Sequence, residues 1–141
     1  MNAPLYSLDI LRLAAASADT PRIGNSMHSA ERRSTLCGSR VSVELVTDDA
    51  SRVSHYGHEV RACALGQASA TILARGIISR RRADLVEVRN TLAAFLAGGS
   101  DTLPKWPDIE VLARARPYAA RHAAILLAFD AAVDALTNES R

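Results

Sequence analysis

The sequence predicts an α+β fold in which a small antiparallel sheet of about three strands packs against helices. Strand-like alternation is confined to the region from about Ser29 to Val60, and helix-like spacing of apolar residues dominates the chain after Cys63. Strands grouped first, with helices after them, are typical of the α+β class. The length of 141 residues, 48% of them hydrophobic, suits a single domain over residues 1–141 with a substantial core.

The first predicted element is a short amphipathic helix within residues 5–18. Its core-facing residues are expected to be Leu5, Ile10, Leu11 and Leu13. No basic residue precedes this apolar stretch, and Asp9 and Arg12 interrupt it, so a secretory signal is not expected. The expected compartment is therefore a reducing cytoplasm, in which cysteines are thiols.

A loop with Pro21 and Gly24 follows, and then the strands begin. A strand over residues 30–36 is predicted on weak alternation. Val41, Val43 and Leu45 alternate with polar residues, as a half-buried strand requires. Residues 48–51 form a polar turn, and residues 52–61 are predicted to be the returning strand of an antiparallel hairpin.

Helices are predicted over residues 64–78, 84–97 and 119–136. The second of these carries an apolar stripe and ends at Gly98-Gly99, and the last has Ile125, Phe129, Val133 and Leu136 on its buried side. Between them, Asp108 is expected to cap a short helix that runs to Ala115. Trp106 stands between two prolines, where its expected role is to anchor the loop to the body of the protein.

Composition excludes several classes of function. The net charge of +2 gives no electrostatic reason to expect a nucleic-acid partner. No apolar run reaches the roughly 18 residues of a membrane-spanning helix. Two cysteines are too few for a disulfide scaffold. His55 and His58 are three residues apart on a strand, so their side chains point to opposite faces and cannot share a metal ion.

The two cysteines carry the chemistry of interest. Cys37 precedes the hairpin turn by about as many residues as Cys63 follows it, and residues equidistant from such a turn become neighbours across the strands, apart from a register slip. Cys63 also lies where the strand leads into a helix, and a helix N-terminus favours the thiolate that binds metals. Two buried structural cysteines, or a disulfide, are the alternative interpretations.

Four stretches resemble the U-type iron–sulfur scaffold family, which comprises IscU, SufU and the N-terminal domain of NifU. They are Tyr6-Ser7 with Thr20-Pro21-Arg22-Ile23-Gly24, then Cys37-Gly38-Ser39-Arg40, then Ala62-Cys63-Ala64 with Gln67-Ala68-Ser69-Ala70, and finally the helix Arg121 to Leu136. The order and spacing of these pieces carry the resemblance, which extends over nearly the whole chain and implies a SufE/NifU-like fold.

The resemblance also implies a function. Members of this family accept sulfur from a cysteine desulfurase, bind iron and pass a cluster to acceptor proteins, without catalysing a reaction themselves. Cys37 and Cys63 would be the ligands of an iron–sulfur cluster or iron, with zinc as another candidate. Because such centres favour four ligands, one expected arrangement is a homodimer that shares the cluster, with two thiolates from each chain.

This sequence departs from the family pattern at two ligand positions. The aspartate of the family's Cys-Gly-Asp motif is Ser39 here, and aligning the last helix places Ala124 where a third cysteine belongs. His122 is a weak substitute, because it lies two residues from the required position. Two other functions therefore stay open. One is a metal-free interaction module, and the other is a relay in which Cys63 takes persulfide sulfur and Cys37 resolves it.

Overall fold

The computed structural model describes residues 6–35 and 38–137. Its elements are α1 (Leu8–Ala16), η1 (Ser17–Asp19), β1 (His28–Arg33), β2 (Arg40–Thr47), β3 (Val53–Arg61), α2 (Ala64–Gly76), α3 (Arg82–Leu96), η2 (Ile109–Ala115), η3 (Ala119–Arg121) and α4 (His122–Thr137). The three strands form one antiparallel sheet in the order β1-β2-β3. The predicted α+β class is confirmed.

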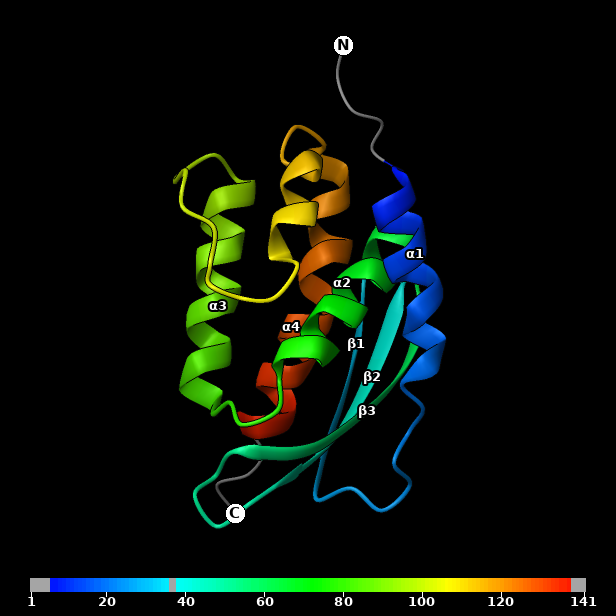
Figure 1. The fold of residues 1–141 in the computed structure, drawn as a ribbon, viewed down its shortest axis with the longest axis vertical. Coiled ribbons are helices and arrows are strands. Elements are labelled where there is room, and N and C mark those ends of the chain that lie inside the picture. Colours follow the sequence, from blue (N-terminus) through cyan, green and yellow to red (C-terminus); the bar gives the residue numbers. More distant parts are fainter. Residues whose placement is uncertain (1–5, 36–37, 138–141) are drawn as a thin grey trace.

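The sheet has one apolar face and one polar face. Val41, Val43 and Leu45 of β2 are completely buried, and they point to the side on which α4 covers β1 and β2 and α2 covers β3. Helix α1 packs against α2, and α3 packs against α4, so the helices gather on one side of the sheet (Figure 1). The alternation of apolar and polar residues in β2 predicted this geometry, because successive side chains of a strand point to opposite faces and only one face is buried.

The N-terminal helix lies within the predicted stretch and buries a partly different set of residues. Ser7 caps it by accepting a hydrogen bond at Oγ from the Ile10 backbone N–H. Ile10, Leu13 and Ala14 are buried, whereas Leu11 is 48% exposed. The prediction for Leu11 was wrong because a helix turns by about 100° per residue, so Leu11 cannot share the face of its neighbour Ile10. Leu5 lies outside the described residues.

Strand β1 begins and ends earlier than predicted, at His28 and Arg33. Its side chains are polar or only partly buried, so it lacks the apolar alternation from which strand ends are recognised. Leu36, the predicted end, lies outside the described residues. The helical predictions hold more closely, because α2, α3 and α4 each begin or end within a few residues of the expected bounds.

Asp108 does not cap η2 through its side chain. It adopts a left-handed backbone conformation with φ of 64°, and its carboxylate forms an ion pair with Arg75 at 3.1 Å instead. Trp106 does anchor its loop, since its indole N–H donates a 2.7 Å hydrogen bond to the carbonyl oxygen of Ile72. Among the described helices, none combines the length and apolarity that crossing a bilayer would require.

Candidate functional site

Cys63 stands at the junction between β3 and α2. Strand β3 ends two residues earlier, at Arg61, and Cys63 takes the N-cap position of α2 with extended backbone angles. Its carbonyl oxygen accepts the hydrogen bond of the Gln67 N–H at 2.9 Å, which starts the helix. The thiol is free and the residue is half-buried at the edge of the core. Cys63 therefore has a fixed backbone and a partly accessible side chain.

At the same end of the sheet, a short loop connects β1 to β2. The Gly38 N–H donates to the Ser34 carbonyl oxygen at 3.0 Å, and the Ser34 N–H donates to the Ser39 carbonyl oxygen at 2.8 Å. Gly38 has a φ of 72°, a conformation that favours glycine, and Ser39 is buried. Cys37 lies outside the described residues, so its predicted proximity to Cys63 stays a prediction.

The register of the hairpin is described up to this end. Arg40 of β2 faces Arg61 of β3, and a bulge between Val46 and Thr47 shifts the ladder by one residue on the way from the turn. The predicted proximity of Cys37 and Cys63 allowed for such a slip. The last pair of the ladder at the other end, Arg40 with Arg61, lies two residues before Cys63.

Ala124 lies in the same corner of the molecule as Cys63. It is buried in the first turn of α4, and Gly66 of α2 packs directly on it. A Cβ atom added to Gly66 would stand 3.4 Å from the Ala124 carbonyl oxygen and 3.8 Å from its Cβ. One turn further on, Ser69 Oγ donates to the Ile125 carbonyl oxygen at 2.6 Å. The N-terminal turns of α2 and α4 are therefore held side by side.

His122 is engaged in the connection that precedes α4. Its Nε2 atom lies 3.0 Å from the carbonyl oxygens of both Ala115 and Arg116. Because a carbonyl oxygen only accepts, Nε2 carries the proton and Nδ1 is the ring nitrogen with a free lone pair. Over residues 6–35 and 38–137, no three histidine, cysteine, aspartate or glutamate side chains come close enough together to hold a metal ion.

His55 and His58 lie on opposite faces of β3, as predicted. His55 is exposed, but His58 is 3% exposed and thus more buried than a surface or half-buried residue. Its Nε2–H donates to the Ser17 carbonyl oxygen at 2.8 Å, and its Nδ1 accepts from the Tyr56 hydroxyl at 2.8 Å. Burial lowers the pKa of His58, against the opposing effect of the Ser17 hydrogen bond.

Glu44 is a positioning residue that the sequence reading missed. Its buried carboxylate accepts hydrogen bonds from the Arg22 guanidinium and from the backbone N–H groups of Ile23 and Gly24. The hydrogen bond from Arg22 is the main cause of the lowered pKa of Glu44. These bonds fasten the loop Thr20–Gly24 to the polar face of the sheet. In the sequence, Glu44 is an ordinary polar residue of an alternating strand, and nothing local distinguishes it.

The triplet Arg80–Arg82 makes contacts within the fold. The Arg80 guanidinium lies over the Trp106 ring at 4.8 Å, Arg81 Nε donates to the Ala50 carbonyl oxygen, and Arg82 Nε donates to Thr137. These side chains join the segment that leads into α3 to the Trp106 loop, the hairpin turn and the last residue of α4. They lie on elements other than those that carry Cys63 and Ala124.

Among known proteins, the relatives of this chain are found through its structure. No family model matches the chain, and a search of curated proteins finds no match. Solved structures do match. A nitrogen-fixing NifU-like protein (N-terminal) from Brucella abortus has a TM-score of 0.88 and 33% sequence identity, with coverage of 97% of this chain and 96% of that chain.

Two further solved structures share the fold at lower identity. One, from Fervidobacterium islandicum AW-1, is proposed as an iron–sulfur cluster assembly scaffold protein for the SUF system; it has a TM-score of 0.80, 19% identity, and coverage of 94% of this chain and 96% of its own. The other is a hypothetical protein with a TM-score of 0.77, 15% identity, and coverage of 91% and 96%. With 33% identity to the Brucella protein over nearly the full length of both chains, this chain belongs to the NifU-like family of U-type scaffolds.

Proposed function

We propose that the protein is a diverged scaffold of iron–sulfur cluster assembly, which holds iron or a cluster through Cys37 and Cys63 and passes it to acceptor proteins. It acts as a carrier and not as an enzyme. The observation that carries the proposal is the position of Cys63 at the fixed junction of β3 and α2, in a fold shared with the NifU-like protein. A thiolate there is a suitable ligand for iron or zinc.

The residues around Cys63 support a weaker site than that of the resembled family. Ser39 stands at the position of the family's aspartate, and Ala124 offers no ligand atom. His122 would contribute only through Nδ1, because Nε2–H is bonded to two carbonyl oxygens. The cargo is therefore held by two thiolates from each chain, and sharing it between two chains would supply the four ligands that such centres prefer.

The test is anaerobic purification followed by measurement of iron, zinc and acid-labile sulfide per chain, before and after reconstitution with iron and sulfide. Stoichiometric metal is expected in the natural protein, with loss in both Cys37→Ser and Cys63→Ser. His122→Ala tests the substitute ligand, and His55→Ala, which changes an exposed histidine on β3, is the matched control. A reconstituted natural protein that holds no metal would contradict the proposal.

The partial exposure of Cys63 favours a second candidate, a sulfur relay with a cysteine desulfurase as donor. The Cys63 thiolate would attack the terminal sulfur of the donor's persulfide, forming a persulfide on Cys63 and releasing the donor as a thiolate. Attack of the Cys37 thiolate on Cys63 Sγ would then release hydrosulfide and leave a disulfide. Persulfide transfer that needs Cys63 but no metal distinguishes this relay from the scaffold.

An interaction module without a metal is the third possibility, and the same variants separate it. Binding to a desulfurase that survives the combined change of Cys37→Ser and Cys63→Ser would favour the module. Binding that survives together with loss of metal and of persulfide transfer would leave docking as the only retained activity. The partners proposed for all three roles are a cysteine desulfurase and cluster-acceptor proteins.

A further inference from the structure

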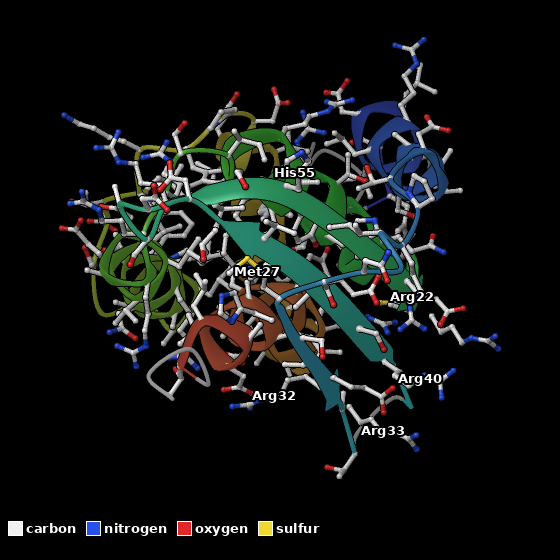
Figure 2. All side chains as sticks on the ribbon, turned by 90° about the horizontal axis from the view of Figure 1, so that it is seen from below. Arg22, Met27, Arg32, Arg33, Arg40 and His55 are labelled. Atoms are coloured by element: carbon white, nitrogen blue, oxygen red, sulfur yellow. The ribbon has the colours of Figure 1, made fainter. Side chains whose placement is uncertain are left out.

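Three arginines stand in a row across the end of the sheet that leads to Cys63. Arg33 of β1 faces Arg40 of β2, and Arg40 in turn faces Arg61 of β3. Directly opposed residues of an antiparallel pair share a face, so the three side chains project from the same face. Figure 2 shows Arg33 and Arg40 at this end of the strands. Neighbouring strands are about 4.8 Å apart, so the row spans about 10 Å between its outer Cα atoms.

This arrangement carries a cost for the fold. Like charges placed directly opposite each other destabilise a sheet, and Arg40 has such a neighbour on both sides. The neutralisation by carboxylates is incomplete. Glu31 lies 2.9 Å from Arg33 but 3.9 Å from Arg40, and the Glu59 carboxylate lies 3.9 Å from Arg61. Within the part of the chain that the structure describes, two carboxylates therefore serve the three guanidinium groups of the row.

The row is accessible to a partner. The side chains of Arg33 and Arg61 are 67% and 68% exposed. Beside them, the polar face has a shallow hollow of about 290 Å³, which Arg22, Ser29, Glu31, Arg40, Ser42 and Glu59 border among others. The short side chains of Ser29 and Ser42 leave the strands open to close approach. The surface is broad and open, and it suits contact with another surface more than enclosure of a small molecule.

We propose that the row Arg33–Arg40–Arg61 is a docking surface for an acidic surface of a partner protein. Arg61 is two residues from Cys63, so a partner seated on the row lies at the cysteine end of the molecule. This assignment rests on the proposed function in one respect, because that function explains why a partner approaches the cysteine end. The charge pattern alone determines the partner's chemistry, since exposed guanidinium groups pair bidentately with carboxylates.

The glutamates within the surface favour a protein over a nucleic acid. Glu31 and Glu59 flank Ser42 in the next row of the same face, two residues along each strand from the arginines, and the net charge of the whole chain is only +2. A continuous phosphate backbone would meet both carboxylates as well as the arginines. A folded partner places its acidic side chains individually, so it can pair with the arginines and present hydrogen-bond donors to the glutamates.

The probe is a fluorescently labelled peptide of twelve glutamates, followed by anisotropy at low and physiological salt. The row variant combines Arg33→Gln, Arg40→Gln and Arg61→Gln. The matched control combines Arg12→Gln, Arg52→Gln and Arg114→Gln, which removes the same charge from three exposed arginines elsewhere. We expect the dissociation constant at low salt to rise at least tenfold in the row variant and to stay within twofold of the natural protein in the control.

Three results would overturn the assignment. They are absence of peptide binding to the natural protein, equal weakening in the row variant and the control, and tighter row-dependent binding of a twelve-nucleotide oligothymidylate or of inorganic phosphate than of the peptide. Circular dichroism of each variant establishes that it is folded. Two measurements distinguish failure of the docking surface from failure of the proposed scaffold function. They are the iron and sulfide content per chain, and peptide binding by the double variant Cys37→Ser, Cys63→Ser. We expect the double variant to bind the peptide normally, even if the protein proves to carry no cluster.

Discussion

Gly66 lies against Ala124, and this contact fixes the first turn of α4 beside the first turn of α2, three residues after Cys63. The absence of a side chain at Gly66 is required on the side of Ala62, because an added Cβ would stand only 2.7 Å from the Ala62 Cβ, whereas the atoms of Ala124 would be at ordinary contact distance. Close packing of small residues at this junction thus holds Ala124 against the first turn of α2, the helix that Cys63 precedes.

Gly66→Ala is therefore expected to destabilise the protein by about 1–2 kcal/mol. Overpacking typically costs about 1–3 kcal/mol, and the better helix propensity of alanine offsets up to about 1 kcal/mol of it. Urea denaturation measures the change. Gly99→Ala is the control, because its Cβ would meet nothing nearer than 3.6 Å. Adding Ala62→Gly removes the nearest atom and is expected to restore stability in part. Equal stability of the natural protein and Gly66→Ala would contradict the tight junction.

Ala124→Cys is expected to strengthen metal binding, because it returns a thiol to the corner that holds Cys63. Zinc affinity, measured by competition with a chromophoric chelator, should rise at least tenfold, since a third thiolate is a strong additional ligand for zinc. Ala123→Cys is the matched control, because it adds a thiol one residue away at an exposed position. A similar gain in both variants would mean that any added thiol suffices and that the corner has no special geometry.

The region around Cys63 shows how much of the site the sequence predicted. The strand-to-helix junction at Cys63 was readable because alternation stops and helical spacing starts there. The neighbourhood of Ala124 came only from the resemblance, because contacts between residues some 60 positions apart leave no local pattern. The arginine row was unreadable for a related reason. It depends on the register of two ladders, and the bulge at Val46 and Thr47 shifts one of them.

The fold itself was predictable where one face of an element is buried. Alternation in β2 and the apolar stripe of α3 gave the correct elements, because burial imposes a period on the sequence. Strand β1 has mostly exposed side chains, so its ends were misplaced. Asp108 had the residue type of a helix cap, but its ion pair with Arg75 and its left-handed backbone override that preference.

The buried His58 is expected to make stability depend on pH between about 5.5 and 7.5. Its pKa in the unfolded chain is about 6.5, and burial lowers the pKa in the folded protein. As the pH falls through 6.5, the unfolded chain takes up a proton before the folded protein does. The free energy of unfolding therefore decreases as the pH is lowered, until the pH lies below the pKa of His58 in the folded protein. Raising the pH has the opposite effect.

Urea denaturation at pH 7.5 and pH 5.5 measures this dependence. His58→Gln should be less stable at pH 7.5 but should lose less stability on acidification than the natural protein. His55→Gln, which changes an exposed histidine on the same strand, should keep the natural pH dependence. If His58→Gln retained the full loss between the two pH values, groups other than His58 would cause it.

Arg40→Thr is expected to stabilise the protein, which is unusual for a change at a central strand position. Arg40 has a like charge directly opposite it on both sides, and among the described residues its one carboxylate partner is Glu31, at 3.9 Å. Removing its charge should raise the free energy of unfolding by about 0.2–1 kcal/mol at low salt, the range found for cross-strand pairs. The gain should shrink as sodium chloride is added, because salt screens the repulsion between exposed charges.

Ser42→Thr is the matched control, because it introduces the same strand-favouring residue on the same face of β2 without a change of charge. Its effect should not depend on salt. A loss of stability in Arg40→Thr at low salt, or a gain that is independent of salt, would mean that the row is not electrostatically strained. Stabilisation that depends on salt would mean that the row persists at a cost to the fold, as expected where the charges serve to bind a partner and not to hold the sheet together.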